Sequence, residues 1–164
     1  MQRYFVLTLL FLSYFSFSQD NDENGFWDNV RYGGGLGVSF GNNTTNIAVL
    51  PSAIYDFNDQ FSLGVNLGYQ YAKRNDISSN VYSGGILSLF NPIPEIQLSA
   101  EFEQLFVNST FNDIKDSYNY PALYIGSAYR VNEYFTVGIR YDVLYNSNQT
   151  IYASAFSPIV RVFF

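Results

Sequence analysis

The sequence contains neither cysteine nor histidine. Without cysteine, the chain can form no disulfide framework, no thiolate nucleophile and no thiol metal site. Without histidine, it lacks the commonest general base near neutral pH and the commonest metal ligand. These two absences remove the usual groups through which a small protein carries out catalysis or holds a transition metal.

Charge is also scarce. Charged residues make up 13% of the 164 residues, which is about half of the usual share in a soluble domain. The formal net charge is −6 and no basic stripe is present, so no nucleic-acid partner is expected. Aromatic residues instead reach 20%, with 15 Tyr, 16 Phe and 12 Gly. This mixture favours strands over helices, and the length suffices for one domain.

The one long apolar run lies at the start of the chain and predicts a cleavable signal peptide over residues 1–18. Arg3 supplies a basic n-region, Tyr4 to Phe17 form an apolar stretch, and small residues precede a cut before Gln19. A membrane anchor is the alternative, but the run is shorter than the roughly 20 residues that a helical span needs. Residues 19–29 are expected to form a polar periplasmic tail. No other run could span a membrane as a helix, so insertion would have to use strands.

The remainder, residues 30–164, divides into eight segments of alternating apolar and polar residues, a pattern typical of transmembrane strands. In the clearest segment every second residue from Phe61 to Tyr71 is apolar. The fourth segment is ambiguous, because Leu87 and Leu89 disagree with either choice of face. The prediction is an all-β, eight-stranded antiparallel up-and-down transmembrane β-barrel. Its expected strands are Val30–Gly41, Ile47–Phe57, Phe61–Ala72, Val81–Phe90, Ile96–Val107, Tyr120–Val131, Phe135–Tyr145 and Ile151–Phe164.

The breaks between these strands alternate in length. Those at 58–60, 91–95 and 132–134 are short, whereas those at 73–80 and 108–119 are longer, with shorter partners at 42–46 and 146–150. Tight turns on one side and longer loops on the other are typical of an outer-membrane barrel with both termini in the periplasm. An internal repeat also relates Tyr55–Val65 to Tyr129–Ile139, and it predicts that Arg130 points away from the face of Tyr129.

The charges within the expected strands all fall on the face opposite the apolar one. An arginine that faces lipid at the bilayer midplane costs about 2–4 kcal/mol, so we expect this charged face to point inward. There the groups can form a salt-bridge network that fills the narrow lumen; an acid/base set built from the same carboxylates is the alternative. A soluble barrel would instead expose these charges and bury the apolar face. The eight residues are Arg31, Asp56, Glu101, Glu103, Arg130, Arg140, Asp142 and Arg161.

The C-terminus repeats the alternation. Phe156, Pro158, Val160, Val162 and Phe164 share one face, and the chain ends on Phe164. The pattern of Val160, Val162 and Phe164 resembles the C-terminal signature that the outer-membrane insertion machinery reads. The sequence therefore predicts this machinery as a partner.

Four segments carry a resemblance to a known family: FWDNVRYGGG (26–35), PSAIYDF (51–57), EIQLSAEFE (95–103) and RYDVLY (140–145). The mature chain resembles small outer-membrane barrels of Bacteroidota-type bacteria and is similar in architecture to the OmpA and OmpX membrane domains. Sequences of this kind are sometimes labelled α-ketoglutarate decarboxylase. Such an enzyme needs a thiamine diphosphate site with a divalent metal and a phosphate cradle, whereas the glycine-rich run 33–37 here lies inside an expected strand.

Three functions follow from these expectations. The first is a barrel with a plugged, charge-balanced interior and a structural or partner-binding role, possible partners being outer-membrane lipid, lipopolysaccharide and a larger outer-membrane complex. The second is a narrow pore, and the third is an outer-membrane enzyme. We expect export through the inner membrane to the cell outer membrane. We expect no catalytic residue, no cofactor and no metal.

Overall fold

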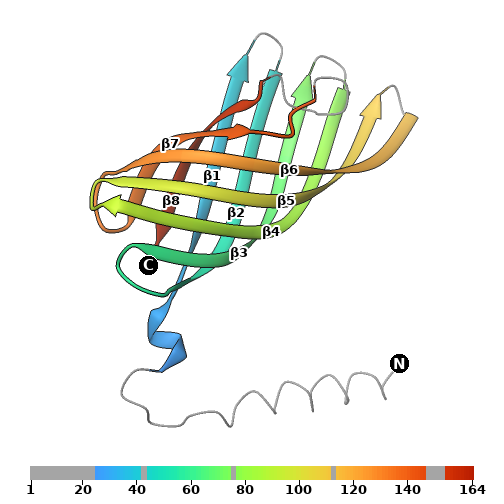
Figure 1. The fold of residues 1–164 in the computed structure, drawn as a ribbon. Coiled ribbons are helices and arrows are strands. Elements are labelled where there is room, and N and C mark those ends of the chain that lie inside the picture. The colour runs from blue at the N-terminus through green and yellow to red at the C-terminus, as the bar shows by residue number, and fades with distance from the viewer. Residues whose placement is uncertain (1–24, 42–43, 75–76, 112–113, 147–153) are drawn as a thin grey trace, which may run out of the picture.

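The computed structural model describes residues 25–41, 44–74, 77–111, 114–146 and 154–164. Their strands follow one another in chain order around a closed antiparallel barrel (Figure 1). This confirms the predicted eight-stranded up-and-down architecture. The strands are β1 (Val30–Gly41), β2 (Thr44–Asp56), β3 (Phe61–Arg74), β4 (Ile77–Ile93), β5 (Ile96–Phe111), β6 (Ile114–Arg130), β7 (Phe135–Asp142) and β8 (Phe156–Phe163).

Three hairpins are longer than the sequence suggests. The expected loops at 73–80 and 108–119 are wrong, because β3, β4, β5 and β6 continue through most of these residues. Polar side chains there pair across strands: the Ser79 and Ser109 hydroxyls lie 2.8 Å apart, and the Ser117 hydroxyl donates to Asn108 Oδ1 at 2.9 Å. The polar residues therefore belong to the ends of the strands that extend beyond the apolar band of the barrel. Backbone hydrogen bonds between neighbouring strands continue there outside the lipid.

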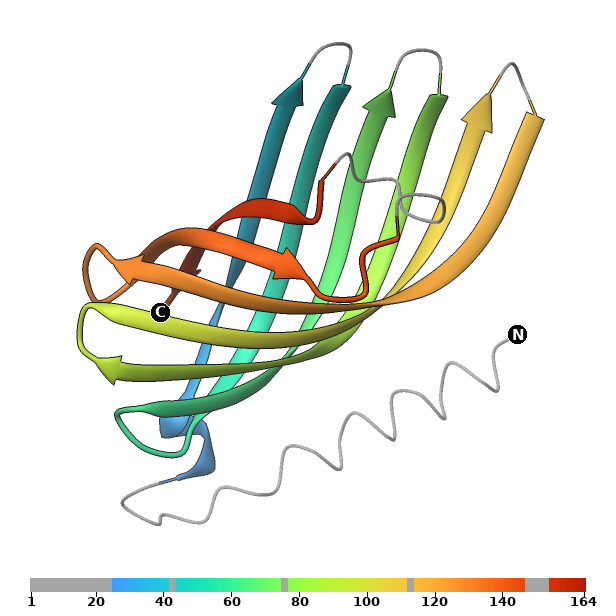
Figure 2. The same cartoon turned by 45° about the horizontal axis from the view of Figure 1, so that its top comes forward.

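The last two strands are shorter than expected. β7 ends at Asp142 rather than at Tyr145, because the chain turns there. Residues 151–153 of the expected eighth strand lie outside the described residues. Among the described residues, β6 pairs with β7 only over 124–130, and β1 pairs with β8 only over 33–36. The three long hairpins consequently rise above β7 and β8 (Figure 2).

Large apolar side chains cover the outer surface of the barrel. On β3, Leu63, Val65 and Leu67 are exposed, whereas the intervening Ser62 and Asn66 are buried. On β4, Ile86 and Phe90 point outward and both Leu87 and Leu89 are buried, which settles the ambiguous strand. Such an arrangement is inverted relative to a soluble protein and is that of a membrane-spanning barrel. No described helix is long and apolar enough to cross a membrane.

Residues just before the barrel pack against its outer wall. Phe26–Asn29 form the 3-10 helix η2, and the Phe26 ring stacks on Tyr55 with centroids 4.8 Å apart. Trp27 meets Phe26 edge-on at 5.2 Å and remains largely exposed. The end of the expected polar tail is thus part of an aromatic cluster at the lower rim of Figure 1. The predicted signal peptide and residues 19–24 lie outside the described residues.

Trp27 is the chain's only tryptophan, so its fluorescence reports on this rim. Indole rings concentrate at the headgroup level of a bilayer. Lipids brominated near the glycerol should therefore quench Trp27 more strongly than lipids brominated at the chain ends. Equal quenching by both lipids, or by neither, would show that η2 does not lie at the interface.

Candidate functional site: a salt-bridged barrel interior

The barrel interior holds two apolar clusters. The upper cluster, toward the long hairpins, consists of Val81, Leu105, Val107, Ala122 and Tyr124. The lower cluster, toward the C-terminus, consists of Ile54, Leu87, Leu89 and Phe163. Along β5, Glu101 and Glu103 precede Leu105 of the upper cluster, and Glu101 pairs in register with Leu87 of the lower one. Charged groups therefore lie between two apolar layers.

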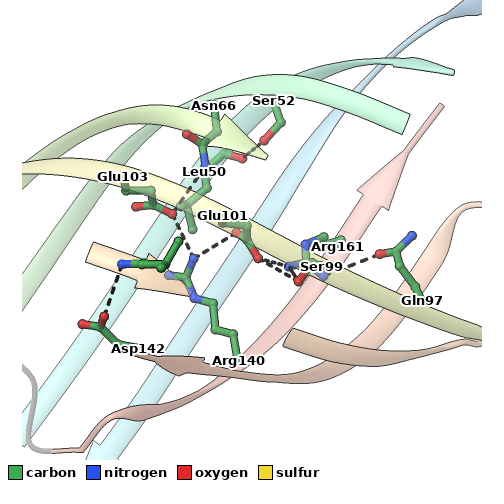
Figure 3. A network of polar contacts seen from close by, with 11 residues as sticks. Leu50, Ser52, Asn66, Gln97, Ser99, Glu101, Glu103, Arg140, Asp142 and Arg161 are labelled. Atoms are coloured by element: carbon green, nitrogen blue, oxygen red, sulfur yellow. Dashed lines mark hydrogen bonds and ion pairs between the residues drawn. The ribbon is translucent and has the colours of Figure 1, made fainter. Parts of the chain in front are cut away.

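Arg140 bridges these two glutamates, and Arg161 pairs with one of them (Figure 3). Arg140 Nη1 lies 3.2 Å from Glu101 Oε2 and 3.0 Å from Glu103 Oε1, and Arg161 Nη2 pairs with Glu101 Oε1. The guanidinium of Arg140 also lies over the Tyr124 ring, 4.0 Å from its centroid. All four charged side chains are at most 6% exposed. The charges of two glutamates and two arginines thus neutralise each other inside the barrel, where water does not reach them.

Neutral polar groups complete this network. Ser99 Oγ donates to Glu101 Oε1 at 3.1 Å and accepts from Arg161 Nη2 at 3.0 Å. Asn66 Nδ2 donates to Glu103 Oε1 at 3.4 Å. Burial of an ion pair is tolerated only when further hydrogen bonds satisfy its remaining atoms. The network has such partners from β3 and β5.

Glycine makes room for these side chains. Register places Gly85 opposite Glu103, and Gly126 opposite Arg140. A Cβ at Gly85 would lie 2.1 Å from the Phe102 carbonyl oxygen, and one at Gly126 would lie 2.4 Å from Ser99 Oγ. A side chain at either position would collide with the network or with the backbone beside it, so a glycine opposite an inward-facing charged residue is a sequence signal for such a network.

A second ion pair lies inside the lower end of the barrel. Arg31 Nε lies 2.5 Å from Asp56 Oδ2, and Arg31 Nη2 donates to Asp56 Oδ1 at 2.8 Å. Ser62 Oγ donates to the same Oδ1, and Arg31 lies over the Phe163 ring at 5.8 Å. This bidentate pair is about a quarter to a third exposed, so it faces the aqueous end of the lumen.

The remaining two predicted residues stand apart. Asp142 is buried, yet it forms no ion pair with a described arginine. Its Oδ1 accepts the backbone N–H of Leu123 at 3.3 Å and of Leu144 at 3.0 Å. Since Asp142 is the last residue of β7, its carboxylate caps the turn that follows. Arg130, at the lower end of β6, has no carboxylate oxygen within 4.0 Å among the described residues.

Little empty space surrounds the network. The voids beside Arg140 measure about 30 and 10 Å³, and one water needs at least about 10–15 Å³ of such volume. Larger hollows, of about 570 and 460 Å³, open at the lower rim where Arg130 lies. Among the described residues, no group of acidic side chains could hold a metal ion.

The C-terminal residues follow the expected alternation. Phe164 is exposed and contacts Tyr134 with ring centroids 5.8 Å apart, while Ile159, Arg161 and Phe163 are buried. Val160 and Val162 lie on the outer face with Phe164. Recognition of these residues by an insertion machinery stays a prediction.

Comparison with known proteins adds similarity of fold. No protein-family model matches the sequence, and no curated protein is similar to it. Similar solved structures include a designed transmembrane β-barrel (16% identity, TM-score 0.44), Ail, the attachment invasion locus protein of Yersinia pestis (10%, 0.45), and Neisserial surface protein A (17%, 0.44). The alignments cover 82% of this chain and 94%, 92% and 96% of those chains, respectively. Sequence identities this low carry no information about the function of this chain.

Proposed function

We propose that the chain is an integral barrel of a Gram-negative outer membrane with a closed interior and a structural or partner-binding role. The observation that carries this proposal is the buried network of Glu101, Glu103, Arg140 and Arg161, held between two apolar layers. A lumen filled in this way stabilises the barrel from within and conducts nothing. The exposed apolar wall supports insertion into lipid.

In the proposed orientation the short turns and the C-terminus face the periplasm. The long hairpins β1–β2, β3–β4 and β5–β6 then project outward, and the exposed Lys73 on β3 is available to lipopolysaccharide phosphates. Export by residues 1–18, membership of the Bacteroidota-type family and docking on a larger complex belong to the same proposal. Affinity purification from native outer membranes tests the last of these.

No observation favours a pore or an enzyme as a second candidate. A pore needs a continuous water path, and the voids beside Arg140 measure only about 30 and 10 Å³, which is room for about two or three waters and about one water, respectively. An enzyme needs a nucleophile and a base within hydrogen-bonding reach. The absence of catalytic activity stays a prediction.

The conductance of the purified protein tests the closed interior. An eight-stranded barrel is just wide enough for its own side chains, and here those side chains are cross-linked by ion pairs. In a planar bilayer the folded protein should therefore give no steady steps of porin size, while a porin measured in parallel gives them. Reproducible open steps of that size would replace this proposal with the pore.

A further inference from the structure

The lower mouth of the barrel contains a hollow that the closed interior does not explain. It measures about 570 Å³ and is lined by the β2–β3 turn, the β4–β5 turn and the end of β6. Small-molecule sites commonly have volumes of about 300–1,000 Å³. An adjoining hollow of about 460 Å³ shares Asn58, Asp59, Asn91 and Arg130 with it. Because the two hollows share these residues, we treat them as one pocket and call it the mouth pocket.

Arg130 sets this pocket apart from the rest of the lumen. The other three inward-facing arginines each pair with a carboxylate. Asp56 interacts electrostatically with Arg130, but both Asp56 oxygens are already engaged by Arg31. Arg130 is half-buried, and a guanidinium in that setting offers five N–H donors in a planar fork that matches a carboxylate.

Two amide side chains line the same pocket, and among the described residues neither NH2 group donates a hydrogen bond. Asn58 Oδ1 accepts the backbone N–H groups of Gln60 and Phe61, both at 2.9 Å. Asn91 Oδ1 accepts from Gln97 Nε2 at 3.4 Å. Because both oxygens are occupied, the NH2 group of each amide is the part left to bind a ligand. The pocket therefore joins one cation to further neutral donors.

Asp59 adds a negative charge to the same pocket. Its exposed carboxylate lines both hollows, yet it lies more than 4.0 Å from Arg130 and pairs with no described cation. Pro92, Ile93 and Pro94 form an apolar wall beside them. A ligand that satisfies all three features carries a carboxylate, an amino group and a small apolar body.

We propose that the mouth pocket binds a short peptide with a free terminal carboxylate and a free amino group. The carboxylate pairs with Arg130, the amino group pairs with Asp59, and an apolar side chain packs on Ile93. This site goes beyond the proposed function, since peptide binding at the rim requires neither a partner protein nor a particular orientation in the membrane.

Calorimetric titration of the folded, full-length mature protein in detergent tests the proposal, with alanyl-alanine as the probe. We expect wild type to bind the dipeptide, and we expect its C-terminal amide to bind at least about tenfold more weakly because a charge-assisted hydrogen bond is lost. Arg130→Gln should weaken the dipeptide by a similar factor. Lys115→Gln is the matched control, because it removes one positive charge from an exposed site at the far end of the barrel.

Asp59→Asn tests recognition of the ligand's amino group separately from recognition of its carboxylate. It should weaken alanyl-alanine but leave N-acetyl-alanyl-alanine unchanged, because the acetylated peptide has no amino group to pair. No binding by wild type, equal binding of the amide, or unchanged binding by Arg130→Gln would overturn the proposal. So would inorganic phosphate binding as tightly as the dipeptide, because the pocket would then be a general anion site. Conductance would refute the closed barrel and leave this titration unaffected.

Discussion

Ile139→Arg should strongly reduce insertion of the barrel. Ile139 lies midway along β7, is 57% exposed on the outer face, and pairs with Ser127 and Pro158 of the neighbouring strands. A lipid-facing arginine near the midplane costs about 2–4 kcal/mol, enough to shift the equilibrium between inserted and unfolded chains by a factor of roughly 30 to 1,000. Heat-modifiable migration on gels, after refolding into lipid vesicles, measures the inserted fraction.

Glu133→Arg is the control for that variant. Glu133 is exposed in the β6–β7 turn, outside the apolar band, so the same new side chain should leave insertion unchanged there. Normal insertion of Ile139→Arg would mean that the outer face does not meet lipid.

Arg140→Ala should lower the free energy of unfolding by about 3–5 kcal/mol, the usual result of leaving a buried charge without its partner. Arg140 is the only described arginine that pairs with Glu103, whereas Glu101 retains Arg161. The charge stranded by the substitution is therefore that of Glu103. Urea-induced unfolding in lipid vesicles measures the loss.

The two glutamates supply matched second substitutions. Adding Glu103→Gln to Arg140→Ala should recover part of the lost stability, because the stranded charge is removed. Adding Glu101→Gln should not, because Arg161 would then lose its partner while Glu103 stayed charged. Equal behaviour of the two double variants would contradict the pairing described here, and a silent Arg140→Ala would contradict burial of the network.

Strand positions and faces were predictable from the sequence because both depend on a local period of two. The alternation from Phe61 to Tyr71 defines β3, and Tyr129 is exposed while Arg130 is half-buried, in agreement with the repeat. Strand ends were not predictable in the same way. Residues 73–80 and 108–119 read as loops because they are rich in Asn, Ser and Asp, yet the ladder continues through most of them.

Partners across the lumen were less predictable than faces. Arg140 on β7 meets Glu101 and Glu103 on β5, two strands away, so their meeting depends on the register of the intervening β6. Asp142, two residues from Arg140 on the same strand, caps a turn instead. Sequence spacing cannot show which of these carboxylates pairs with Arg140, because Glu101, Glu103 and Asp142 all lie on the inward face.

The alternation of lipid-facing and lumen-facing residues is the central claim, and oxygen accessibility of spin labels measures it directly. The chain has no cysteine, so single cysteines can be placed one at a time from Val65 to Gln70 and labelled in vesicles. Oxygen concentrates in the bilayer interior, so labels at Val65, Leu67 and Tyr69 should be highly accessible and labels at Asn66 and Gln70 should be protected. A flat profile, or one with the two sets reversed, would contradict the barrel described here.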